Sequence, residues 1–250
     1  MAATKPGAIK RFYENVDELA IVTAFDPGGT TGYCVMGVHP DVLTGDRPGD
    51  LHAQLAVFDY GQIDCGTRHG QTGVGMRRGH DGLNMPGEFL GTLQMINLWE
   101  ESGGCVVLED FVLDVGKANQ GRDLLLPVRI ISGFSTLAQY CFNGLKGHGD
   151  QALEHIFIQN RSLAKTTCTD DRLKVWGLYD GHSGPHARDA VRHAFYFLRD
   201  RRGSGFDASR KRHIAWPHLF SDQEIHGLAG TQKSRKVGVQ RVGERVTGLG

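Results

Sequence analysis

The hydrophobic residues near the start of the chain fall into three short runs, each with the length of a β-strand. LAIVTAFD at 19–26 and TGYCVMGV at 31–38 are separated by one tight turn, which predicts a hairpin. HAQLAVFDYG at 52–61 predicts a third strand, and the polar segment 39–50 before it predicts a loop. The chain is therefore expected to open with three antiparallel strands.

After residue 88 the hydrophobic pattern indicates helices that alternate with strands. Phe89, Leu93, Ile96 and Trp99 recur every three to four residues, which predicts an amphipathic helix over 88–102. The later predicted elements are a strand at 105–113, a helix at 124–142 that begins near Pro127 and stops at Gly144, a strand at 155–160, and helices at 171–179 and 185–200. This order predicts an α/β fold, with a mixed sheet covered by helices on both faces.

The remaining segments set the expected domain limits. One domain is expected at 19–202, preceded by a polar lead-in at 1–18. The glycine-rich segment 61–88 has neither a helical nor a strand period, which predicts a long mobile loop within that domain. Residues 203–250 are basic and glycine-rich without a lasting period, so a flexible tail is expected there.

Composition narrows the class of protein but does not favour a charged partner. Lys plus Arg and Asp plus Glu each number 28, although eleven basic residues against five acidic ones follow position 198. The five cysteines are scattered without CxxC spacing, which argues against a disulfide framework or a structural zinc site. No apolar stretch has the length of a membrane span or the pattern of a signal peptide. A cytoplasmic protein with reduced thiols and no membrane association is expected.

Acidic residues on two predicted strands and on the last predicted helix carry the strongest chemical signal. Asp26 ends the first strand, and Glu109 lies in the fourth. His186, Asp189 and His193 share one face of the last helix. A strand order of 3-2-1-4 would place Asp26 and Glu109 side by side, and the last helix packing across them would complete an oxygen-rich pocket.

Carboxylates brought this close repel one another unless cations lie between them. Mg²⁺ suits such a site because it prefers carboxylate oxygens and water and is often shared with substrate phosphates. Mn²⁺ fits the same ligands. Two such ions about 3.5 to 4 Å apart could activate a water and stabilise the leaving oxygen of a phosphodiester. The pattern therefore predicts a two-ion centre that hydrolyses a nucleic-acid strand.

Four motifs together resemble the RuvC-like Holliday junction resolvases of the ribonuclease H-like superfamily, and the phage-encoded members most closely. They are DPGGTTG, VVLEDF, QNRSLAK and HARDA, and they span roughly 19–200. The resemblance implies a ribonuclease H-like sheet of strand order 3-2-1-4-5 and a homodimer that resolves four-way DNA junctions by paired nicks. It implies metal ligation by Asp26, Glu109 and Asp189, with His186 where some members have another aspartate. For a phage protein, the compartment would be the host cytoplasm.

Five residues are candidates for contact with branched DNA. Lys165, in QNRSLAK, could contact the scissile phosphate or a flanking one, with a solvated lysine as the alternative. Arg68, Arg77 and Arg78 in the glycine-rich segment suit phosphate contacts that add affinity without reading bases, although charged loops are commonly just solvated. Phe111 lies near the place where family members use an aromatic side chain to wedge the junction open.

Other interpretations of the same residues stay open. Asp26 could merely cap the Asp-Pro-Gly turn, and His193 is more typical of a packed histidine than of a ligand. A nuclease of the same chemistry could prefer flaps, forks or RNA/DNA hybrids. DPGGT also resembles the phosphate loop of actin- and hexokinase-type ATPases, but nothing after residue 104 supplies the second loop that they need. A non-catalytic DNA-binding protein has no reason to keep three mutually repelling acids.

Overall fold

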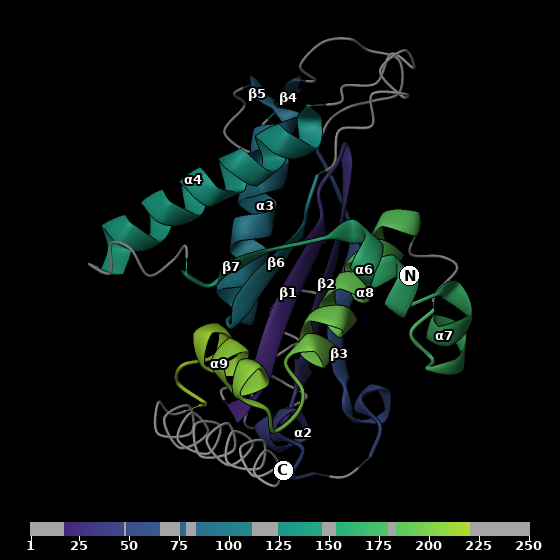
Figure 1. Ribbon diagram of the computed structural model, residues 1–250. Helices are drawn as coiled ribbons and strands as arrows, with labels where there is room; N and C mark the ends of the chain where they lie inside the picture. Colours follow the sequence, from purple (N-terminus) through teal and green to yellow (C-terminus); the bar gives the residue numbers. More distant parts are fainter. Residues whose placement is uncertain are drawn as a thin grey trace, which may run out of the picture.

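A computed structural model describes residues 18–47, 49–65, 76–78, 84–111, 125–146, 154–179 and 184–220 of the chain. Its centre is a five-stranded sheet in the order β3-β2-β1-β6-β7 (Figure 1). The strands are β1 (Ala20–Asp26), β2 (Thr30–Val38), β3 (Ala56–Asp64), β6 (Cys105–Glu109) and β7 (Ile156–Gln159). Numbered by their order within this sheet, the strands run 3-2-1-4-5, so the predicted mixed sheet is confirmed.

The pairing of the strands fixes which of their ends meet. β2 runs antiparallel to β1, with Asp26 opposite Gly32. β6 runs parallel to β1, with Leu108 beside Phe25, and β7 runs parallel to β6. Because β1 and β6 are parallel neighbours, their carboxyl ends lie at the same edge of the sheet.

Helices cover both faces of the sheet, as predicted (Figure 1). α3 (Gly87–Ser102) and α4 (Leu126–Lys146) lie on one face, where their hydrophobic side chains pack against Phe25 of β1 and the even-numbered residues of β6. α8 (Pro185–Asp200) lies on the other face against Val22 and Ala24. Successive side chains of a strand point to opposite faces, so Asp26 shares the α8 face with Val22 and Ala24.

Short helices occur where the sequence predicted none. Residues 39–50 were expected to form a loop, but α2 (Pro40–Thr44) begins there, because Pro40 starts the helix and His39 Nδ1 accepts a hydrogen bond from the Asp41 amide. α6 (Arg161–Thr167) was missed; its cap is Asn160, whose side chain accepts from the Ser162 amide. α7 (Asp170–Val175) accounts for the helix that was predicted at 171–179.

Several predicted limits need correction. A 3₁₀ helix (Leu51–Gln54) precedes β3, so the third strand begins at residue 56 and not at 52. β6 ends at Glu109 and not at 113. α4 continues past Gly144, the predicted stop.

The segment 61–88 is not simply a loop. β3 continues to Asp64, and β4 (Met76–Arg78) pairs with β5 (Asn84–Pro86) in a small antiparallel sheet. The prediction failed because each of these two strands has only three residues, too few to show a period. Arg77 and Arg78 thus lie on a strand, whereas Arg68 is outside the described residues.

The expected flexible tail is wrong at its beginning. α9 (Phe206–Ala215) follows α8, and Trp216 and Phe220 are buried in the core on the α8 face. Trp216 Nε1 donates a hydrogen bond of 2.8 Å to the carbonyl of Ile21 in β1. Buried Arg212 donates to three backbone carbonyls, those of Leu43, Arg201 and Gly203. The packed part of the chain therefore extends at least to residue 220.

The same packing encloses most of the thiols. All five cysteines are free, in line with the expectation from their spacing, and four are buried. Burial raises the pKa of Cys105 and Cys168 to about 12 and raises those of Cys34 and Cys65. Only Cys141, on α4, is partly exposed. None of the helices in the described ranges has the length and apolar character needed to cross a bilayer.

A thiol titration should report this burial. With Ellman's reagent at pH 8, we expect one thiol to react quickly in the native protein, because only Cys141 is accessible and only thiolates attack the reagent. All five should react in guanidinium chloride. Rapid reaction of two or more native thiols would show that the core opens readily or is packed differently.

Candidate metal centre

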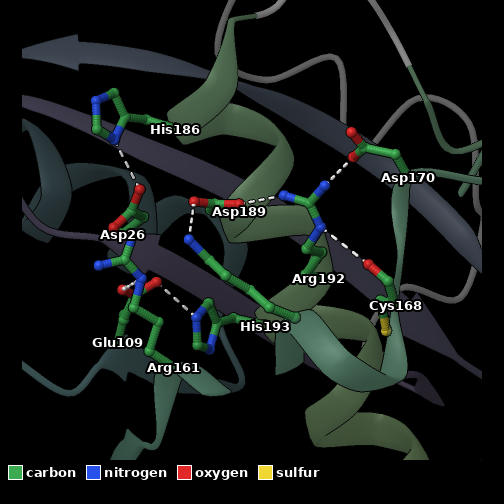
Figure 2. Close-up of polar contacts among 10 residues, drawn as sticks. Asp26, Glu109, Arg161, Cys168, Asp170, His186, Asp189, Arg192 and His193 are labelled. Atoms are coloured by element: carbon green, nitrogen blue, oxygen red, sulfur yellow. Dashed lines mark hydrogen bonds and ion pairs between the residues drawn. The ribbon is translucent and has the colours of Figure 1, made fainter. Parts of the chain in front are cut away.

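Three carboxylates that are far apart in the sequence meet at the edge of the sheet. Asp26 ends β1, Glu109 ends β6, and Asp189 lies in the second turn of α8 (Figure 2). One oxygen from each lies within 4.8 Å of the others. Asp26 and Glu109 are only 8% and 7% exposed, and Asp189 is partly buried. The predicted meeting of these three acids is confirmed.

Gly32 explains how α8 comes close enough to β2 to complete this cluster. A Cβ atom built at Gly32 would lie 1.9 Å from the carbonyl oxygen of His186, in the first turn of α8. No side chain other than hydrogen fits there. The glycine of β2 therefore lets the helix approach, and His186 Nδ1 lies 2.7 Å from Asp26 Oδ2.

The DPGGTTG turn uses its own polar groups internally. The Gly28 amide donates to Thr31 Oγ1, and that hydroxyl donates to the Gly28 carbonyl. The carbonyl of Gly29 accepts a hydrogen bond from the Cys65 amide. The Gly28 amide is thus already satisfied, whereas a phosphate loop directs its amides at the ligand. This geometry counts against the ATPase interpretation.

Each of the three carboxylates has a partly exposed cationic or imidazole partner. His186 is bound to Asp26, Arg161 Nε lies 3.1 Å from Glu109 Oε1, and Lys165 Nζ lies 2.6 Å from Asp189 Oδ2. These three partners are 31% to 55% exposed at the side chain. Partners exposed to this degree can turn into solvent when another cation takes their place.

Two carboxylates also have a fully or mostly buried partner on α8. His193 is fully buried and its Nε2 lies 2.7 Å from Glu109 Oε2. Arg192, which is 12% exposed, pairs with Asp189 Oδ1 (Figure 2). A packed histidine was the alternative interpretation of His193, and the structure shows its ring packed in the core. The same ring also contacts Glu109.

The surroundings shift the pKa values of Asp26 and His186. Burial raises the pKa of Asp26; the nearby Glu109 and Asp189 charges raise it further, and the hydrogen bond from His186 opposes them. The hydrogen bond to Asp26 raises the pKa of His186. Burial, together with the charges of Glu109 and Asp189, therefore disfavours the ionised form of Asp26.

The donor set fits a hard divalent cation. Two oxygens that each lie about 2.1 Å from one Mg²⁺ can be no more than about 4.2 Å apart. The carboxylate oxygens here lie within 4.8 Å of one another, so they need to move together only slightly to share one ion, or they can hold two ions. The amide of Gln159, on β7 beside Glu109, is also buried, and neither of its polar atoms has a hydrogen-bond partner among the described residues. The three carboxylates and an adjacent imidazole thus meet at one site, and an unpartnered amide lies on the neighbouring strand.

The structure brings together most of the predicted site residues, but not all of them. Asp26, Glu109, Asp189, His186 and Lys165 are in one cluster. Phe111 follows β6 and is half-buried, and its proposed contact with a junction stays a prediction. The phosphate contacts of Arg68, Arg77 and Arg78 also stay predictions.

Sequence reasoning missed both arginines of the site and the unpartnered amide of Gln159 on the neighbouring strand. Gln159 and Arg161 are the first and third residues of the QNRSLAK motif, which was examined only for its lysine. Arg192 lies three residues after Asp189, a spacing that places the two on one helix face. That spacing was the available signal.

The similarity of this chain to a solved structure is weak. No protein-family model matches the chain, and neither does any curated protein. Among solved structures, the crystal structure of the yeast mitochondrial Holliday junction resolvase aligns with a TM-score of 0.41 at 10% sequence identity, over 84% of this chain and 87% of that one. A similarity this low does not establish a shared function.

Proposed function

We propose that this protein is a metal-dependent endonuclease that hydrolyses DNA phosphodiesters and resolves four-way junctions by paired nicks. The observation that carries the proposal is the meeting of Asp26, Glu109 and Asp189 within 4.8 Å at the edge of the sheet. Three acids this close repel one another, and their partly exposed side-chain partners Arg161, Lys165 and His186 can give way to metal ions. Hydrolysis of a phosphodiester is the chemistry that such an oxygen site supports best.

Each residue of the cluster then has a role. Asp26, Glu109 and Asp189 would hold two Mg²⁺ ions, with Mn²⁺ as a substitute, and His186 is the adjacent candidate ligand. When bound, the ions supply an activated water and stabilise charge on the leaving oxygen. Lys165 lies beside Asp189, and once released from it can bind a phosphate oxygen. Half-exposed Arg161 can bind the DNA backbone in the same way.

The preference for branched DNA rests on the resemblance of the four motifs to junction resolvases. The sheet order 3-2-1-4-5 agrees with what that resemblance implies. Two nicks placed symmetrically across a junction need two active sites, so the proposal includes a homodimer.

A panel of labelled substrates tests both the nuclease activity and the preference for four-way junctions. We expect the full-length protein to make paired nicks in a four-way junction with Mg²⁺ or Mn²⁺ and none with EDTA. Linear duplex should remain intact. Cleavage of flaps, forks or RNA/DNA hybrids in preference to the junction would support the nuclease activity but contradict the proposed junction substrate. Junction binding without cleavage of any member of the panel would favour a non-catalytic DNA-binding protein.

A further inference from the structure

Arg192 has contacts that set it apart from the other cations of the centre. Its Nε donates 2.9 Å to the carbonyl of Cys168, one Nη pairs with Asp189 Oδ1, and the other pairs with Asp170 Oδ1 (Figure 2). Cys168 caps the end of α6, and Asp170 is the first residue of α7. One guanidinium therefore joins α8 to the connection between α6 and α7.

Resting on the metal centre proposed above, we infer that Arg192 is a positioning residue. It holds one oxygen of Asp189 and leaves the other for the ion. Its side chain is 12% exposed and its planar group is bonded on three sides, so it has no room to leave. A carboxylate needs only one oxygen to bind a cation, and Oδ2 of Asp189, which pairs with Lys165, is the one that Arg192 leaves to it.

Lys165 differs from Arg192 although both bind the same carboxylate. Lys165 Nζ bonds only to Asp189 Oδ2 among the interactions of the described residues, and its side chain is 31% exposed. An ammonium on a flexible stem can turn away when a divalent ion takes that oxygen. Lys165 is therefore a displaceable counter-charge, whereas Arg192 fixes the orientation of the ligand.

Electrostatics and positioning predict opposite effects for the loss of Arg192. A guanidinium beside the site repels a divalent cation, so removing its charge should tighten binding if charge alone matters. Loss of a residue that orients a ligand should weaken binding, and such outer partners typically contribute about 10- to 100-fold in metal affinity. The sign of the change therefore separates the two roles.

Mn²⁺ binding to the full-length protein, followed by electron paramagnetic resonance, tests the inference without an activity assay. We expect Arg192→Met and Arg192→Lys to weaken Mn²⁺ binding by about 10-fold. Lys165→Met is the matched control, since it removes one positive charge from the same carboxylate, and it should bind Mn²⁺ as tightly as the wild type or a few-fold more tightly. Arg192→Lys keeps the charge, but its single nitrogen cannot reach three acceptors that Arg192 contacts with three different nitrogens.

The outcomes distinguish this inference from the proposed function. If the wild type binds Mn²⁺ and both Arg192 variants bind it equally well or better, Arg192 does not position Asp189, and the metal centre stands. If the wild type binds no Mn²⁺, the metal centre and this inference fail together. Should Arg192→Met fail to fold, Arg192→Lys decides, together with Asp170→Asn, which removes only the half-exposed remote anchor and should weaken binding to a lesser extent.

Discussion

Replacing Asp26 with Asn is expected to reduce Mg²⁺-dependent cleavage of a four-way junction by about 10³-fold or more. The neutral amide cannot hold a divalent ion as the carboxylate does, and the ions supply several kcal/mol of transition-state stabilisation, at about 1.4 kcal/mol for each factor of ten. Single-turnover cleavage rates at saturating protein measure the loss. A rate within about tenfold of the wild type would remove Asp26 from the centre.

The same variant should be more stable than the wild type when metal is absent. Burial and the neighbouring acids disfavour a charge on Asp26, and Asn removes that charge while it can still accept a hydrogen bond from His186. A gain of about 1 kcal/mol, or about 2–4 °C in Tm, is typical when a strained active-site residue is replaced. Asp110→Asn, next to Glu109 but outside the cluster, is the control and should change neither activity nor Tm.

Gly32→Ala is expected to have the largest effect on stability. The new methyl group would lie 1.9 Å from the His186 carbonyl oxygen and 2.7 Å from the Ala187 amide nitrogen, both of which are backbone atoms that cannot turn away. Relief of the clash requires α8 to move from β2, at a cost of about 3 kcal/mol or more, which lowers Tm by about 6–12 °C. A displacement of about 1 Å at the site would also slow cleavage by about 10²-fold.

Gly28→Ala is the matched control in the same motif. A Cβ at Gly28 would meet only the Thr30 carbonyl oxygen, at 3.4 Å, which is an ordinary contact. Thermal melts should therefore leave Gly28→Ala within about 1 kcal/mol of the wild type. Equal destabilisation by both substitutions would mean that the turn needs glycine for its own conformation and not for the approach of α8.

The sequence was most informative where structure depends on neighbours along the chain. The limits of α8 were predicted to the residue, and β1 and β2 to within one residue, because period and flanking turns define such elements locally. The same local pattern put Asp26 at a strand end and His186 and Asp189 on one helix face. It did not find β4, β5 or α6, since a few residues do not establish a period.

The prediction of a flexible tail after residue 202 failed for a different reason. Residues 206–220 look polar and irregular, yet Trp216 and Phe220 reach the core, and the Arg212 guanidinium donates to the carbonyls of Leu43, Arg201 and Gly203. A helix with so weak a hydrophobic stripe is stabilised by what it packs against. That partner surface exists only once β1 and α2 have folded.

The candidate site also has features that the sequence indicated and features that only the tertiary structure shows. The sequence alone indicated which acids could meet, because a strand end and a helix face are local properties, and the resemblance to junction resolvases implied the strand order. Only the tertiary structure decided what surrounds the acids: His193 lies against Glu109, Arg192 lies between Asp189 and Asp170, and Gly32 lies against the start of α8. These contacts join residues from different elements, and no periodicity along the chain records the distance between atoms that meet only in the folded protein.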